Sequence, residues 1–130
     1  MTAAPTFRKQ ERIVSDLLIE TLFEKGDSQS LAAYPLRVVY LQTERQPGHA
    51  PIQILISVPK KRFKHAVDRN RVKRQIREVY RRHKQLVING IEEGRELLIA
   101  FIWISDRHCP SAEVEKRVVG LLKRIAKREK

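Results

Sequence analysis

The chain of 130 residues has few of the features that mark secreted or membrane proteins. It has a single cysteine, Cys109, so no disulfide can form within the chain, and we expect a reducing compartment. The richest apolar run, Leu97 to Ile104, falls far short of the roughly 20 residues of a membrane span and is typical of a buried strand. Residues 1–9 lack the apolar run of a signal peptide. We therefore expect a cytoplasmic protein with no membrane partner.

Residues suited to catalysis are also scarce. The four histidines are scattered along the sequence: His49, His65, His83 and His108. No pair of them has a spacing that would place a general acid and a general base on one structural element. No acidic pair suits a two-metal site, and one cysteine with isolated histidines does not make a zinc site. We predict no catalytic residue, no intrinsic metal or cofactor, and no small-molecule substrate.

Negative charge is the next shortage, because 15 Asp and Glu oppose 27 Lys and Arg, which leaves a net charge of +12. An excess of this size attracts polyanions, of which nucleic acid is the commonest. The charge is concentrated between residues 60 and 84, where 12 basic residues face only Asp68 and Glu78. This one segment has a net charge of +10, so its surface is the candidate binding surface.

Apolar periodicity and turn residues predict one domain over residues 1–130, with residues 1–8 as a flexible tail. We expect helices over about 9–23, 66–87 and 111–127, and strands over 36–41, 52–58 and 96–105. Residues 27–33 are expected to form a polar loop, and Ser111 to cap the last helix. The first two strands should pair antiparallel, because their connection is too short for a crossover. The predicted fold class is α+β, a single-domain sandwich in which helices pack on a small central sheet.

Helical geometry separates the charges of the basic segment from its apolar residues. With Arg69 at 0° and ~100° per residue, the band from ~0° to ~140° holds Arg69, Lys73, Arg77, Asn70, Arg81 and Arg74. The apolar residues Val72, Ile76 and Val79 lie together at ~280° to ~340°. Cations at successive i, i+4 positions repel by a few tenths of a kcal/mol. A polyanion offsets that repulsion, because each neutralised phosphate releases counterions. The alternative is an ordinary solvated basic face, which the one-sided clustering disfavours.

Two stretches of the chain carry a longer pattern. Residues 66–77 read A-V-x-R-N-x-x-K-R-x-x-R, and Ser57-Val58-Pro59-Lys60-Lys61 precede them. Both resemble the protein subunit of bacterial ribonuclease P, in which a strand ending in S-V-x-K-K precedes a helix with an Arg-Asn-Arg motif. Phe7-Arg8-Lys9 and Phe23-Glu24-Lys25-Gly26 resemble the opening of that family. The resemblance covers most of the chain in the right order.

The resemblance implies a function and a fold beyond what composition indicates. It implies the protein subunit of a site-specific endoribonuclease that removes the 5′ leader from precursor tRNA. The catalytic centre would then lie in the RNA subunit and use Mg²⁺, and one protein monomer would bind one RNA. It also implies a left-handed β-α-β crossover, as in a ribosomal-protein second domain and domain IV of elongation factor G. Such a crossover is an exception to the right-handed rule.

The resemblance and the charge pattern together assign two sets of site residues. The RNA-binding set is Lys60, Lys61, Arg62, Arg69, Asn70, Lys73, Arg74, Arg77 and Arg81. The leader-binding cleft would comprise Arg8, Phe23, Tyr40 and Ser57. An aromatic ring can stack on any base, which suits a leader of variable sequence. Ile19 stands where the family often has a second aromatic residue, which leaves Tyr40 as the stronger candidate. Core packing is the alternative for Phe23 and Tyr40, and we expect Trp103 in the core.

Two other kinds of function stay open at this point. A ribosome-associated protein of the same fold would use the same helix on structured RNA, without a role in cleavage. A self-sufficient nuclease would need clustered acids or histidines, which the sequence does not show.

Overall fold

The computed structural model describes residues 22–23 and 28–128. Its elements in chain order are β1 (Gln29–Ala33), β2 (Leu36–Glu44), β3 (Ile52–Ser57), α2 (Ala66–His83), α3 (Gln85–Ile88), β4 (Arg95–Trp103) and α4 (Ser111–Arg128). Leu22 and Phe23 are helical, as expected for the end of a helix over 9–23. The rest of that helix and the predicted tail over 1–8 lie outside the described residues. The predicted α+β class is confirmed.

The four strands form one mixed sheet in the order β1-β2-β4-β3. β2 pairs antiparallel with both β1 and β4, whereas β3 pairs parallel with β4. The predicted pairing of strand 36–41 with strand 52–58 is therefore wrong, because β4 lies between them. Residues Leu97–Phe101 of β4 are buried on both faces of the sheet, so a central position removes more apolar surface from water than an edge position would. The connection between β2 and β3 has to span only two inter-strand distances, of roughly 5 Å each.

Strand β1 lies where a polar loop over 27–33 was predicted, so that prediction is wrong. It pairs with β2 from Gln29 opposite Tyr40 to Ala33 opposite Leu36. Leu31 is its one fully buried side chain and joins the helix-facing core. Its remaining residues, Gln, Ser and Ala, are not types enriched in strands, so the local sequence signal is weak. β1 is therefore stabilised by its pairing with β2 and its contacts with α4, rather than by a high strand propensity of its own residues.

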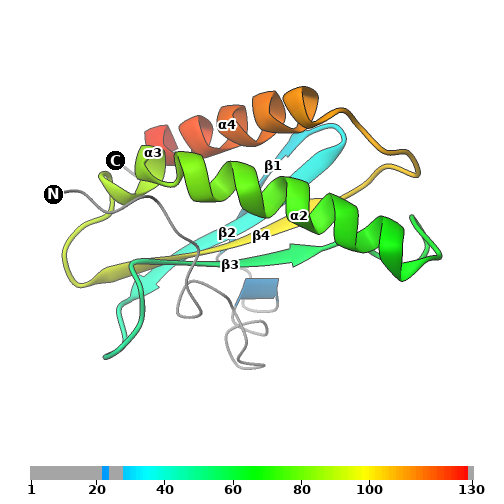
Figure 1. The fold of residues 1–130 in the computed structure, drawn as a ribbon. Coiled ribbons are helices and arrows are strands. Elements are labelled where there is room, and N and C mark those ends of the chain that lie inside the picture. Colours follow the sequence, from blue (N-terminus) through cyan, green and yellow to red (C-terminus); the bar gives the residue numbers. More distant parts are fainter. Residues whose placement is uncertain (1–21, 24–27, 129–130) are drawn as a thin grey trace, which may run out of the picture.

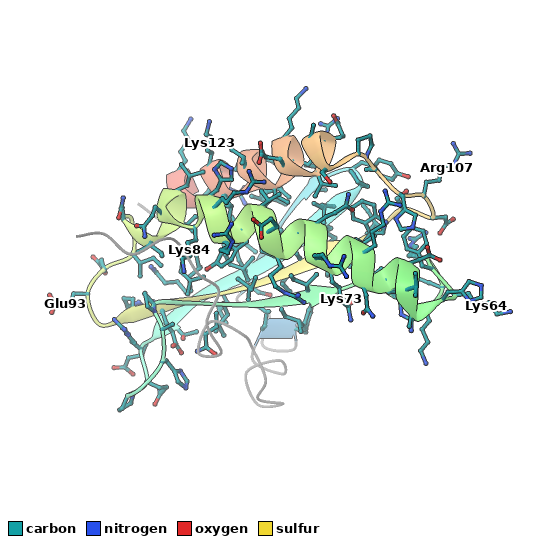
Figure 2. The ribbon with its side chains drawn as sticks, in the orientation of Figure 1. Lys64, Lys73, Lys84, Glu93, Arg107 and Lys123 are labelled. Atoms are coloured by element: carbon teal, nitrogen blue, oxygen red, sulfur yellow. The ribbon has the colours of Figure 1, made fainter. Side chains whose placement is uncertain are left out.

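A β-α-β crossover joins two adjacent parallel strands: β3, then α2, then β4. In Figure 1, β3 lies nearest the viewer and runs to the right, α2 returns to the left above the sheet, and β4 runs to the right behind β3. This path makes the crossover left-handed, as the family resemblance implied and against the usual preference. All three labelled helices cover the same face of the sheet, and Figure 2 shows Lys123 on α4 pointing away from it.

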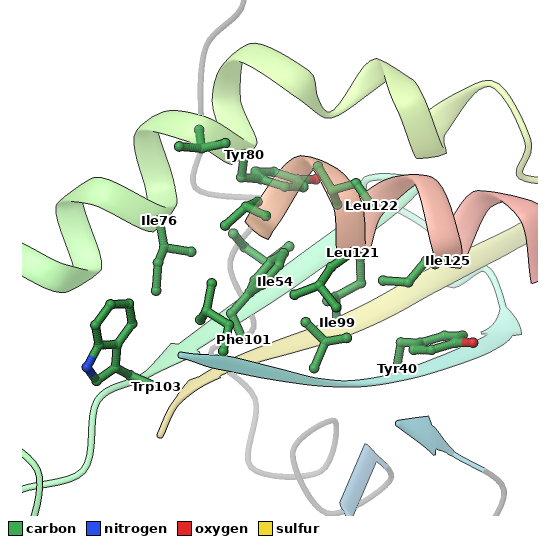
Figure 3. Close-up of a cluster of buried hydrophobic side chains, with 14 of the residues drawn as sticks. Tyr40, Ile54, Ile76, Tyr80, Ile99, Phe101, Trp103, Leu121, Leu122 and Ile125 are labelled. Atoms are coloured by element: carbon green, nitrogen blue, oxygen red, sulfur yellow. The ribbon is translucent and has the colours of Figure 1, made fainter. Parts of the chain in front are cut away.

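The main core lies between that face of the sheet and the helices. Alternate residues of each strand point into it, and Figure 3 shows Ile54, Ile99 and Phe101 from the sheet in one cluster with Ile76 of α2 and Leu121 of α4. Helix α2 contributes its buried residues at helical spacing: Val72, Ile76, Val79 and Tyr80. Trp103 is completely buried, which confirms its predicted place in the core.

The opposite face of the sheet carries a smaller apolar cluster. Val39, Leu98 and Ala100 are buried there against Leu22. By strand alternation, Arg37 and Ser57 lie on this same face. The two clusters explain why β4 is apolar at almost every position, since its residues alternate between them.

Two helix boundaries differ from the predictions. Helix α2 ends at His83, four residues before the predicted end, and the short α3 follows after Lys84. Ser111 was predicted as an N-cap but is the first residue of α4. The carbonyl of Pro110 accepts the first helical hydrogen bonds, from the amides of Glu113 and Val114 at 3.0 and 3.1 Å. The Ser111 hydroxyl is instead 3.2 Å from the Gln75 amide nitrogen, which donates to it.

Matched leucine substitutions test the core. Leu122→Ala in α4 removes a side chain with no exposed surface and should lower the free energy of unfolding by about 2–5 kcal/mol. Leu86→Ala in α3 makes the same chemical change at a side chain that is 38% exposed, and should cost about 1 kcal/mol or less. Urea unfolding followed by circular dichroism measures both. Equal losses would contradict the assignment of α4 to the core.

Candidate nucleic-acid interface

Helix α2 presents three chemically different sides. Its apolar side packs on the sheet, as described above. The side toward α4 is polar and paired: the Gln75 amide nitrogen donates to the Cys109 carbonyl at 3.0 Å, and Arg82 forms an ion pair with Glu115 at 2.7 Å. The third side faces neither the sheet nor α4 and carries most of the predicted RNA-binding residues. The separation of charged and apolar residues predicted from helical geometry is confirmed.

We define the cationic face as Asn70, Lys73, Arg74 and Arg77. Asn70, Arg74 and Arg77 are exposed and Lys73 is partly exposed; Figure 2 shows Lys73 on the side of α2 away from α4. None of the four side chains forms a hydrogen bond or an ion pair with another residue in the described part of the chain. Three unpaired cations and an amide therefore stand side by side at i, i+3 and i+4 spacing, available to an external anion.

The cationic face ends where Glu78 begins to neutralise its neighbours. The Glu78 carboxylate accepts hydrogen bonds from Arg81 and lies 3.8 Å from the Nε of Arg82. The hydrogen bond from Arg81 holds the pKa of the Glu78 carboxyl below its usual range, and the same contact raises the pKa of Arg81. Arg81, one of the predicted RNA-binding residues, is thus already paired within the protein.

The basic loop, residues 59–65, extends the positive surface beyond the start of α2. Lys60 and Lys61 are exposed and have no side-chain partner among the described residues, whereas Arg62 lies 3.3 Å from Asp106. Arg69 turns back from α2 and donates to the carbonyls of Phe63 and Lys64 at 3.0 and 2.9 Å. Arg69 therefore holds the loop against the helix. Arg69 stays in the predicted RNA-binding set. The structure adds a second role, holding the basic loop, that the sequence did not reveal.

Comparisons with known proteins identify the family. A sequence model described as Ribonuclease P matches residues 7–126. The chain belongs to the ribonuclease P protein family. It is 42% identical, over an alignment 131 positions long, to the ribonuclease P protein component of Porphyromonas gingivalis strain W83, covering 97% of this chain and 92% of that one. It is 35% identical to the component from Chlorobium phaeobacteroides, covering 90% and 85%.

Solved structures of the ribonuclease P family share the fold. A mutant RNase P protein from Staphylococcus aureus superimposes with a TM-score of 0.67 at 24% identity, over 92% of this chain and 90% of that chain. The RNase P protein from Thermotoga maritima gives a TM-score of 0.59 at 24% identity, over 90% and 97%. The α+β architecture is therefore that of ribonuclease P proteins.

The predicted leader-binding residues of this ribonuclease P protein are not brought together as a single set. Arg8 lies outside the described residues. Phe23 is 45% exposed and follows Leu22, which packs on the sheet face opposite the helices; Ser57 is on that same face. Tyr40 points the other way, is 1% exposed, and belongs to the main core.

The environment of Tyr40 argues against the predicted role of its ring in stacking on RNA. Its hydroxyl donates to the Gln29 side chain at 3.2 Å and accepts from Arg128 at 3.3 Å. Figure 3 shows the ring in the core cluster beside the helices. The core alternative is the one that the structure supports, because the alternation of β2 places residues 36, 38 and 40 on the helix side.

Sequence reasoning missed the pairing of Asp68 with His108. Their side chains, 40 residues apart, lie 3.0 Å from each other at the start of α2. No group of three or more His, Cys, Asp and Glu side chains in the described ranges is arranged to hold a metal ion. No helix among the same residues is long and apolar enough to cross a membrane.

A pair of arginine substitutions tests the division of α2 into free and paired cations. Arg74→Ala should weaken binding to a bacterial ribonuclease P RNA and lower the slope of log affinity against log salt by about one. Arg81→Ala removes the same charge from the same helix, but Glu78 already offsets it, so we expect less than half of that change. Filter binding over a series of salt concentrations measures both. Equal effects would show that the pairing with Glu78 does not persist when RNA binds.

Proposed function

We propose that this chain is the protein subunit of a bacterial ribonuclease P, and that it binds the catalytic RNA through the cationic face and the basic loop. The observation that carries the proposal is the unpaired state of Asn70, Lys73, Arg74 and Arg77 on the motif helix of a family member. Arg side chains can each make two parallel hydrogen bonds to a phosphate, and Asn can reach a base edge or a ribose hydroxyl.

The energetics of the cationic face favour RNA as its ligand. Lys73 and Arg77 are one turn apart and repel in the free protein, by a few tenths of a kcal/mol. Binding to phosphates removes that repulsion and releases condensed counterions, so affinity should fall steeply as salt rises. The exposed Lys60 and Lys61 add two phosphate contacts at the end of the same surface.

In this proposal the chemistry of leader removal belongs to the RNA subunit. One protein monomer would bind one RNA, in the cytoplasm, where the pair would process precursor tRNA. Mg²⁺ would be held mainly by the RNA. The protein cations would lessen repulsion between phosphates of the RNA and the substrate, and so lower the Mg²⁺ concentration that cleavage requires.

The 5′ leader of precursor tRNA is proposed to lie on the sheet face opposite α2 and α4. Phe23 follows Leu22, which packs on this face, and its ring is exposed. Ser57 and the exposed Arg37 offer a hydroxyl and a cation for the sugar-phosphate backbone. This assignment keeps Phe23 and Ser57 from the predicted set and adds Arg37. Tyr40 would support the face from the core side rather than contact RNA.

A cleavage assay tests the function. Precursor tRNA, the ribonuclease P RNA of Porphyromonas gingivalis and a low Mg²⁺ concentration should give faster removal of the leader when this protein is added. The protein without RNA should give no cleavage. An unchanged rate at every Mg²⁺ concentration, with tight RNA binding, would instead favour the ribosome-associated alternative. Cleavage by the protein alone would favour the self-sufficient nuclease.

Two exposed aromatic residues test the leader-binding face. Phe23→Ala should weaken binding of precursor tRNA to the assembled ribonucleoprotein by ~1–3 kcal/mol, because a stacked base is lost. It should leave the affinity for mature tRNA, which has no leader, unchanged. Tyr34→Ala, in the turn between β1 and β2, removes a ring that is 64% exposed and should affect neither substrate. Equal losses for precursor and mature tRNA would refute the assignment.

A further inference from the structure

The loop between β4 and α4, residues 104–110, lies against the basic loop and the start of α2. The imidazole of His108 stacks on the ring of Phe63, with centroids 4.4 Å apart and an angle of 18° between the planes. Figure 2 shows Lys64 and Arg107 at the same end of the molecule, where these two loops meet. Phe63 is only 9% exposed, is the one buried residue of the basic loop, and belongs to the main core. Phe63 therefore anchors the loop in the core, and the His108 ring is one of the groups that it packs against.

His108 also contacts α2 directly. Its Nε2 lies 3.0 Å from Oδ1 of Asp68, in the first turn of the helix. Its Nδ1 is buried and has no hydrogen-bond partner in the described part of the chain. The ring is therefore held by two contacts, the stack on the basic loop and the bond to α2, and it joins those two elements.

Two further contacts support the same junction. Arg62 of the basic loop pairs with Asp106 at 3.3 Å, and Gln75 of α2 donates to the carbonyl of Cys109 at 3.0 Å. The loop between β4 and α4 thus reaches the basic loop through residues 106 and 108, and α2 through residues 108 and 109. By contrast, the side chains of Lys60 and Lys61 form no hydrogen bond or ion pair with the described residues, so their position follows from the backbone of the basic loop.

We propose that His108 is a positioning residue for RNA binding: through Phe63 and Asp68 it orders the basic loop so that Lys60 and Lys61 continue the cationic face. This inference rests on the proposed binding of ribonuclease P RNA. It also explains why an acidic residue stands at position 68 within a segment of strong positive charge. Asp68 is the acceptor that holds His108, in addition to suiting the positive end of the helix dipole.

The test compares the effect of losing the lysines in two backgrounds. The probe is an in vitro transcript of the Porphyromonas gingivalis ribonuclease P RNA. In the unaltered protein, the double substitution Lys60→Ala, Lys61→Ala should weaken binding about 10-fold, since two phosphate contacts are lost. In a His108→Ala background, the basic loop loses its stack on His108 and keeps only the contacts of Arg69 and Arg62. If those contacts do not suffice to place the lysines, the same double substitution should weaken binding less than about 2-fold.

Arg74→Ala is the matched control, because Arg74 lies on α2 and does not depend on the basic loop for its position. Its cost should be the same in both backgrounds. A role of His108 in general stability alone would reduce the Arg74 and lysine effects alike or leave both unchanged. His108→Ala by itself should weaken RNA binding about 5- to 10-fold and lower the salt slope, as expected when the lysine contacts are lost.

Substitutions of Asp68 keep the test decisive if His108→Ala does not fold. Asp68→Asn retains an acceptor for His108 and should bind RNA about as well as the unaltered protein, whereas Asp68→Ala should reproduce the effects expected of His108→Ala. Equal, additive costs of the lysine substitutions in every background would overturn the inference. Failure of the unaltered protein to bind the RNA would instead refute the proposed function, so the two failures are distinguishable.

Discussion

The burial of β4 on both faces is the constraint on which the rest of the structure depends. Residues Leu97–Phe101 are almost without exposed surface, and only the centre of a sheet covered on two sides provides that environment. Placing β4 between β2 and β3 separates two strands that are neighbours in sequence and makes the β3–β4 pair parallel. The parallel pair requires α2 as its crossover, so burial of one strand also determines where the motif helix lies.

Core packing of α2 is strong enough to hold the unpaired cations of the cationic face close together. Each buried apolar residue of α2, such as Val72 or Ile76, stabilises the fold by roughly 1.5–3 kcal/mol, whereas each repulsive pair on the cationic face costs a few tenths. The core contacts therefore outweigh the repulsion by a wide margin, and the helix can present unpaired cations without losing its place. Glu78 limits the surface at one end, and the junction around His108 organises it at the other.

Several sequence-based predictions succeeded because they depended on local periodicity. The helix predicted over 66–87 is found at 66–83, and the buried strand predicted over 96–105 is found at 95–103. Both elements, and the separation of the helix into apolar and cationic sides, follow from residue spacing that tertiary contacts reinforce. The errors lie where non-local pairing decides. Gln29–Ala33 has only a weak strand signal of its own, and the pairing order of the strands depends on competition for the central position. Tyr40 was predicted to line the leader-binding cleft because its position matches an aromatic position of the family. In the strand it lies on the same side as Leu36 and Val38, so its ring is buried in the core.

The amino-acid sequence by itself determined the class of fold, the family and the concentration of positive charge on one helix, because these depend on composition and on spacing within single elements. Only the tertiary structure decided which of those charges are free. Glu78 stands within about one helical turn of both Arg74 and Arg81, so residue spacing permits either pair, yet the Glu78 carboxylate pairs with Arg81 and leaves Arg74 unpaired among the described residues. The contact of Asp68 with His108 likewise joins residues 40 positions apart. That second contact depends on a distance through space, which residue spacing along the chain does not specify.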